Sequence, residues 1–188
     1  MRGSRSVIVS AVFGAVLVSA LASADAQEGQ LFPLRAWDRQ FADARVRYAE
    51  LRGWHKEAVL DRETGLVWQR SPIDLALTWT AALAACRTTA IGGRYGWRAP
   101  QEEELASVGE AAKGAGTPPI IPDGAPFIGV SGVAFWTATT EEAVTSDAYV
   151  IVFGTTSTES AGVIAAEGKT AQHGIWCVRG AIGAQNPQ

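Results

Sequence analysis

The side chains best suited to chemistry in this sequence are two cysteines and two histidines, and their spacing fits few reactions. Cys86 and Cys177 lie far apart, as do His55 and His173. A zinc site is usually built from closely spaced ligands, and a serine hydrolase needs a nucleophile-elbow motif beside its histidine. Neither pattern occurs. We therefore interpret both histidines as solvated surface residues and predict no catalytic residue, no cofactor and no metal ligand.

The N-terminal residues have the pattern of a secretion signal. Arg2 and Arg5 precede an apolar run over residues 7–21, and residues 24–26 read Ala-Asp-Ala, a small-x-small cleavage site. The apolar run is too short for a comfortable membrane span, and no later segment is better suited. The sequence predicts a signal peptide over residues 1–26 and a secreted protein, periplasmic or extracellular, with no membrane span.

Export gives the two cysteines a simple interpretation. Disulfides persist in oxidising compartments, so Cys86 and Cys177 are predicted to pair. In the chain-entropy model such a bridge stabilises the fold by roughly 4 to 5 kcal/mol. Two buried free thiols remain the alternative interpretation.

The charge and the aromatic residues limit the choice of partner. The net charge is −3 and becomes −4 when Arg2, Arg5 and Asp25 leave with the signal peptide, so nucleic acid is not an expected partner. Of the seven tryptophans, five occupy apolar positions of predicted elements and are expected in the core: Trp68, Trp79, Trp97, Trp136 and Trp176. Trp37 and Trp54 lie outside that set and are our candidate ligand contacts.

Alternation and turn signals predict strands over residues 45–51, 58–60, 66–68, 133–139, 148–153 and 174–179. Residues 61–65 form a predicted tight turn. Residues 154–168 hold either a further short strand or a loop.

Two helices are expected. Thr78 is a predicted N-cap for a helix that carries Cys86 on its buried face and stops at Gly92 and Gly93. A second helix begins near Pro100, where residues 102–104 are all glutamate and suit a solvated first turn.

The predicted organisation is a signal peptide, an arm or linker over residues 27–44, one domain over residues 45–180 and a flexible tail over residues 181–188. Residues 114–132 are rich in Gly and Pro and are predicted to form a long irregular excursion.

A succession of short motifs resembles one known family. The motifs are Asp61-x-x-Thr64-Gly65-Leu66-Val67-Trp68-Gln69, Trp79 through Cys86, Gly96-Trp97-Arg98-Ala99-Pro100, Glu104-Leu105, Phe135-Trp136-Thr137-Ala138-Thr139 and Trp176-Cys177-Val178-Arg179. In this order they resemble the Lcl C-terminal domain family, named for a collagen-like protein. The chain departs from the family pattern at Ala99 and Gln101, where Leu and Thr are usual, and no collagen-like tract precedes the domain.

The resemblance implies an α+β fold of the C-type-lectin-like and formylglycine-generating-enzyme-like kind. Two helices would pack on twisted antiparallel strands, with long loops and one disulfide. It also implies that Arg98 locks its loop by stacking on an aromatic ring or by pairing with Asp61 or Glu104.

This resemblance favours a binding function over catalysis. The Glu-Pro-Asn and Trp-Asn-Asp motifs of a calcium-bridged sugar site do not occur, and the only asparagine is Asn186. The closely spaced copper-binding cysteines of formylglycine-generating enzymes are missing as well. We expect a non-enzymatic module that binds a glycan or a protein of the envelope or extracellular space through loops 114–132 and 154–172. The alternatives are a structural envelope component without a separate ligand and an oxidative enzyme of the formylglycine-generating kind.

Overall fold

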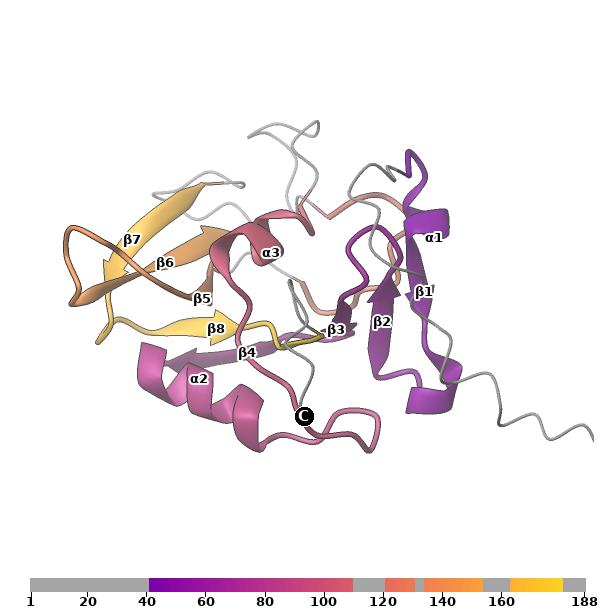
Figure 1. Cartoon of the computed structure of the whole chain (residues 1–188), viewed down its shortest axis with the longest axis horizontal. Helices are drawn as coiled ribbons and strands as arrows, with labels where there is room; N and C mark the ends of the chain where they lie inside the picture. The colour runs from indigo at the N-terminus through magenta and orange to yellow at the C-terminus, as the bar shows by residue number, and fades with distance from the viewer. Residues whose placement is uncertain (1–40, 110–120, 131–133, 154–162, 181–188) are drawn as a thin grey trace, which may run out of the picture. The chain divides into compact units, whose positions relative to one another are not determined.

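The computed structural model describes residues 41–109, 121–130, 134–153 and 163–180 (Figure 1). The chain divides into two units, residues 1–33 and 34–188, and every described residue belongs to the second. The predicted signal peptide, most of the predicted arm with Trp37, and the predicted tail lie outside the described residues. No helix in the described part of the chain is long and apolar enough to cross a membrane.

One sheet has four strands in the order β1-β2-β3-β9, and all its neighbours are antiparallel. Its strands are β1 (Tyr48–Glu50), β2 (Ala58–Asp61), β3 (Val67–Gln69) and β9 (Val178–Arg179). The tight turn predicted between β2 and β3 is confirmed. Gly65 has a φ of 73°, and the Asp61 carboxylate accepts hydrogen bonds from the Glu63 amide and the Thr64 hydroxyl.

The second sheet has five strands in the order β4-β8-β5-β6-β7. They are β4 (Ile73–Leu77), β5 (Ala134–Thr140), β6 (Asp147–Val152), β7 (Ile164–Gly168) and β8 (His173–Ile175). The expectation of purely antiparallel strands is wrong, because β8 enters between β4 and β5 and runs parallel to β5. Strand β4 was not predicted, since three of its five residues are exposed and show no alternation.

The single strand predicted over residues 174–179 is two strands, β8 and β9, in different sheets. Trp176 and Cys177 lie between them. There the Trp176 indole donates to the carbonyl of Gln69, and the amide of Gln69 donates to the carbonyl of Cys177. This crossing therefore connects the two sheets through both backbone and side chain.

The two predicted helices are present as α2 (Trp79–Thr88) and α3 (Glu102–Ala106). Thr78 occupies the N-cap position of α2, but its side chain makes no capping bond. The helix ends at Thr88 and not at the predicted Gly92 and Gly93, because Thr89 is already extended.

The first predicted strand, residues 45–51, is wrong in its first half. Residues Ala44–Arg47 form a helical turn, α1, and only Tyr48–Glu50 pair as a strand. The Asp43 carboxylate caps this turn by accepting from the Arg45 amide at 2.9 Å, and that hydrogen bond holds the pKa of Asp43 below its ordinary value. A short 3-10 helix, η2 (Arg52–Trp54), follows β1.

The two segments expected to be recognition loops differ. Residues 121–130, the described part of 114–132, contain no helix or strand, as predicted. The described part of 154–172 contains β7, so this segment is not a simple loop.

Two groups of buried residues form most of the core. The disulfide cluster consists of Ala58, Val67, Ala82, Cys86, Ile91, Trp97, Ala99, Ala134, Trp136, Ala148, Val150, Val152, Ile175 and Cys177. The aromatic cluster consists of Leu66, Trp68, Leu105, Val108, Phe135, Ile151, Phe153, Trp176 and Val178. Strand β5 contributes to both, because Phe135 and Trp136 point to opposite faces of the sheet.

Candidate binding surface

The predicted disulfide is confirmed. Cys86 and Cys177 are bonded, with their Cα atoms 5.4 Å apart and both side chains buried. The bond joins α2 to the segment between β8 and β9, so it fixes the helix to the place where the chain changes sheets.

Arg98 pairs with Glu104, one of its two predicted partners. Its Nη1 donates to one carboxylate oxygen of Glu104 at 2.6 Å and its Nη2 to the other at 2.5 Å. Glu104 is 1% exposed, so the expectation that this glutamate is solvated is wrong. The Glu104 carboxylate also accepts from the Gln101 backbone amide at 2.7 Å and so caps its own helix, which gives the buried charge a second partner.

Asp61, the other predicted partner, pairs with a different arginine, Arg47. The Nε and Nη2 of Arg47 donate to the two carboxylate oxygens of Asp61 at 3.0 and 2.8 Å. Burial disfavours the charge of Arg47, but the hydrogen bond to Asp61 and the nearby charges of Asp61 and Glu63 raise the pKa of Arg47 overall. Arg47 also donates to the carbonyl of Ser107, just after α3.

The histidines have different environments. His55 is exposed, as predicted, and has a φ of 51°. His173 is not a solvated surface residue: its Nε2 lies 2.8 Å from a carboxylate oxygen of Glu167, and its ring packs on the edge of Trp136 at 4.8 Å between centroids. Reasoning from sequence missed this pair because the two residues flank the connection between β7 and β8, a segment with no clear pattern.

Four of the five tryptophans expected in the core are buried: Trp68, Trp97, Trp136 and Trp176. Trp79 is only partly buried. Its indole N–H donates to the carbonyl of Thr137 at 2.9 Å, and the Lys169 ammonium lies 4.4 Å from its ring centroid.

Trp54, a predicted ligand contact, is half-buried and surrounded by cations. The guanidinium carbons of Arg94 and Arg179 lie 4.7 and 5.3 Å from its ring centroid. One edge of the ring meets Trp97 at 6.1 Å and 90°. Such cation–π contacts fix both the ring and the guanidinium groups. Trp54 is therefore anchored in the core on one side and placed beside two positive charges on the other.

A tight turn after α2 holds this arrangement. Ile91 and Arg94 exchange backbone hydrogen bonds, and Gly92 and Gly93 between them have φ values of 60° and 71°. Gly92 lies directly against Trp54, because a Cβ atom added there would come within 2.8 Å of the Trp54 carbonyl oxygen. Only glycine permits both this backbone conformation and this close approach.

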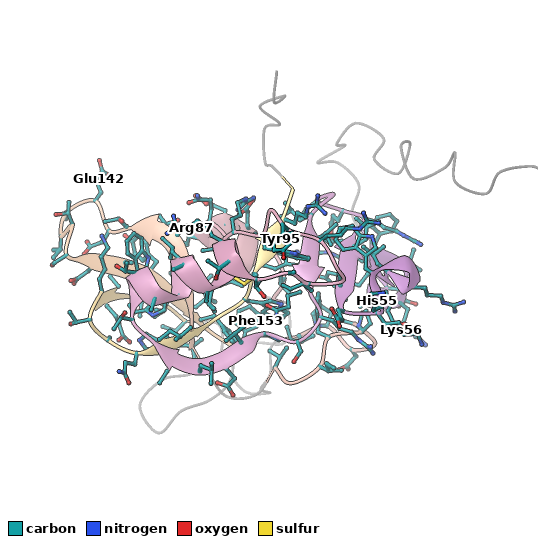
Figure 2. All side chains as sticks on the ribbon, turned by 90° about the horizontal axis from the view of Figure 1, so that it is seen from below. His55, Lys56, Arg87, Tyr95, Glu142 and Phe153 are labelled. Carbon is teal, nitrogen blue, oxygen red and sulfur yellow. A yellow bond between two sulfur atoms is a disulfide. The ribbon has the colours of Figure 1, made fainter. Side chains whose placement is uncertain are left out.

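Tyr95, the residue that follows this turn, is 69% exposed. In Figure 2, which views the molecule from the side of α2, Tyr95 lies between Arg87 of α2 and His55. We define the Trp54 surface as Trp54, His55, Arg94, Tyr95 and Arg179. Its Tyr95 ring is exposed to solvent, and its two guanidinium groups are oriented by the Trp54 ring. This composition is suited to binding polar or anionic ligands.

Arg94, Tyr95 and Arg179 were not predicted for this surface. Arg179 follows the Trp-Cys pair in a strand that was expected to be structural. The Gly-Gly pair was interpreted as a helix stop, although it was the signal for a turn that presents Arg94 and Tyr95. Among the described residues, no group of three or more His, Cys, Asp and Glu side chains is arranged as a metal site.

Comparison with known protein families agrees with the motifs. A model of the Lcl C-terminal domain matches residues 57–179. The match begins just before β2 and ends with β9, so it includes both cysteines, the Arg98 and Glu104 pair and the turn that presents Tyr95. A comparison with curated proteins finds no match. The chain belongs to the Lcl C-terminal domain family.

Proposed function

We propose that this chain is an exported, non-enzymatic binding module of the C-type-lectin-like kind. It recognises a glycan or a protein of the envelope or extracellular space, without a calcium-bridged sugar site. The recognition surface in this proposal is the Trp54 surface. In the second loop expected from sequence, residues 164–168 belong to β7, whereas the recognition role expected for residues 114–132 stays a prediction.

One observation carries the proposal: the exposed Tyr95 directly follows a turn whose backbone lies against Trp54. Arg94 and Arg179 lie over the Trp54 ring at 4.7 and 5.3 Å, and the Glu57 carboxylate accepts from the Gly92 amide at 2.6 Å. Recognition residues commonly lie on loops that a rigid scaffold positions. Tyrosine and arginine side chains are also enriched at the centres of binding interfaces.

Export in this proposal is supported by the leader pattern of residues 1–26 and by the disulfide. Disulfides are rare in reducing compartments and persist in oxidising ones. The bond between Cys86 and Cys177 therefore fits a periplasmic or extracellular protein.

The test is binding of the purified, oxidised protein to a broad glycan array, with calcium and with a chelator. We expect specific binding that the chelator does not remove. Tyr95→Ala and Arg179→Gln should each weaken it about tenfold, equivalent to about 1.4 kcal/mol. Arg62→Gln is the matched control, because Arg62 is an exposed arginine of the β2–β3 turn outside the Trp54 surface.

Two outcomes would count against the proposal, and a third would redirect the search. Binding that is unchanged in both variants places the recognition surface elsewhere. Binding that requires calcium contradicts the expected absence of a calcium bridge. A blank array from folded protein turns the search to protein partners, by crosslinking in the native envelope, and failure there favours a purely structural role.

A further inference from the structure

A shallow depression lies between α2, the segment before α3, and β5. It has a volume of about 160 Å³ and is lined by Leu83, Arg87, Arg98, Ala99, Gln101 and Ala138. Three of these residues are aliphatic. For scale, an apolar cavity of about 150 Å³ holds a benzene molecule. The depression therefore has room for a small aliphatic group, and it shares no residue with the Trp54 surface.

The two arginines at this depression differ in how many hydrogen-bond partners their guanidinium groups have. A guanidinium has five N–H donors, and those of Arg98 all have partners. They donate to both carboxylate oxygens of Glu104, to the carbonyl of Ala99 and twice to the carbonyl of Gly180. Arg98 thus forms part of the wall, with its charge balanced by Glu104.

Arg87 is exposed on α2, and its guanidinium group forms no ion pair or hydrogen bond with the residues that the structure describes. Figure 2 labels Arg87 on α2. It lies one residue after Cys86, whose disulfide fixes this part of the helix to the core. Among the described residues, Arg87 is therefore a positive charge without an ionic partner, beside the aliphatic side chains of the depression and on a helix that the disulfide holds.

Gln101 supplies a neutral donor on another side of the depression. Its side-chain oxygen accepts from the Thr139 hydroxyl at 3.1 Å and, as part of the capping box of α3, from the Glu104 amide. Its side-chain nitrogen, Nε2, makes no hydrogen bond within the described part of the chain. The oxygen's two partners fix the orientation of the side chain and leave the NH₂ group to donate.

We propose that this depression binds a carboxylate carried on a small aliphatic group, such as the C-terminal alanine of a peptide. Arg87 donates to the carboxylate in the planar two-bond arrangement that guanidinium groups form with carboxylates. The Gln101 amide donates to the same end of the ligand, and the methyl group lies against Leu83, Ala99 and Ala138. This inference does not rest on the proposed function, because no residue of the Trp54 surface takes part.

The test is an NMR titration of the isotope-labelled full chain with N-acetyl-Ala-Ala. We expect saturable shifts at the amides of Leu83, Ala99 and Ala138. The same dipeptide with a C-terminal amide, which lacks the charge, should bind at least about tenfold more weakly. Formate, which has the charge without the aliphatic group, should also be weaker by that factor.

Arg87→Gln should weaken the dipeptide at least about tenfold, whereas the control Arg62→Gln should leave its affinity unchanged. Tyr95→Ala should also leave it unchanged, which separates this site from the Trp54 surface. Equal binding of the acid and the amide, equal binding of formate, shifts confined to other residues, or an Arg87→Gln variant with unaltered affinity would each overturn the proposal.

Discussion

The two core clusters differ in the side chains that fill them. Trp176, at the centre of the aromatic cluster, meets Trp68, Phe127, Phe135 and Phe153 with ring centroids 4.9 to 5.8 Å apart. The disulfide cluster contains many alanines and valines, which remove less apolar surface from water per residue. It also contains the only disulfide in the chain, between the only two cysteines. The comparison indicates that the crosslink offsets the smaller side chains of the cluster that contains it.

The largest effect should come from removing the crosslink. The bond joins residues 91 positions apart, so the chain-entropy model gives a loss of roughly 4 to 5 kcal/mol in the free energy of unfolding. Urea denaturation of the double variant Cys86→Ala with Cys177→Ala, compared with the oxidised protein, measures this loss. A loss below about 1 kcal/mol would show that the small side chains of the disulfide cluster are stable without the crosslink, and would contradict the proposed difference between the clusters.

Removing a large ring from the other cluster should cost nearly as much. Trp176→Ala should reduce the free energy of unfolding by about 4 kcal/mol, because the cavity would lie among the surrounding rings. Its neighbour Ile175 belongs to the disulfide cluster, and Ile175→Val should cost only about 1 kcal/mol. Equal effects of the two substitutions in the same denaturation assay would contradict the distinction between the clusters.

The third prediction concerns the ion pair at the border of the aromatic cluster. Glu104 precedes Leu105, a member of that cluster, and is neutralised by Arg98. Arg98→Gln leaves a buried carboxylate without its partner and should cost about 3 kcal/mol, at the low end for buried pairs because Arg98 is itself one-third exposed.

Adding Glu104→Gln to Arg98→Gln should recover part of this loss, since the buried charge is then gone. The surface change Arg62→Gln should stay within about 0.5 kcal/mol of the parent. If the double variant is no more stable than Arg98→Gln alone, the explanation by an unpaired buried charge is wrong.

The smallest effect tests the turn that joins the Trp54 surface to the disulfide cluster. Gly92→Ala should destabilise by about 2 kcal/mol, because the new methyl group meets the Trp54 backbone. Gly93→Ala is the matched control: its φ is also positive, but the nearest atom to an added Cβ is 4.0 Å away on His55. It should cost about 1 kcal/mol, the cost of the left-handed backbone alone. Thermal unfolding of both variants measures the difference, and equal losses would show that the close approach has no energetic weight.

The disulfide, the family and most of the strands could be predicted from the sequence, because each follows from local patterns or from the compartment. For Arg98 the family motif suggested Asp61 or Glu104 as partner, and only the structure distinguishes them: Glu104 pairs with Arg98, and Asp61 pairs with Arg47. The crossing at Trp176 and Cys177 could not be predicted, since a run of apolar residues does not say which sheet each half joins. The Trp54 surface was found only in part, because its arginines are far apart in sequence and are brought together by the turn at Gly92 and Gly93.

The crossing also determines when the domain can fold during synthesis. Strands β8 and β9 come from residues 173–179, yet β8 lies between β4 and β5, and β9 pairs with β3. Neither sheet can reach its final strand order until this segment has left the ribosome, and such late pairing between distant segments slows folding. At synthesis rates of roughly 5 to 20 residues per second, the nascent chain spends several seconds with the surfaces of both clusters uncovered.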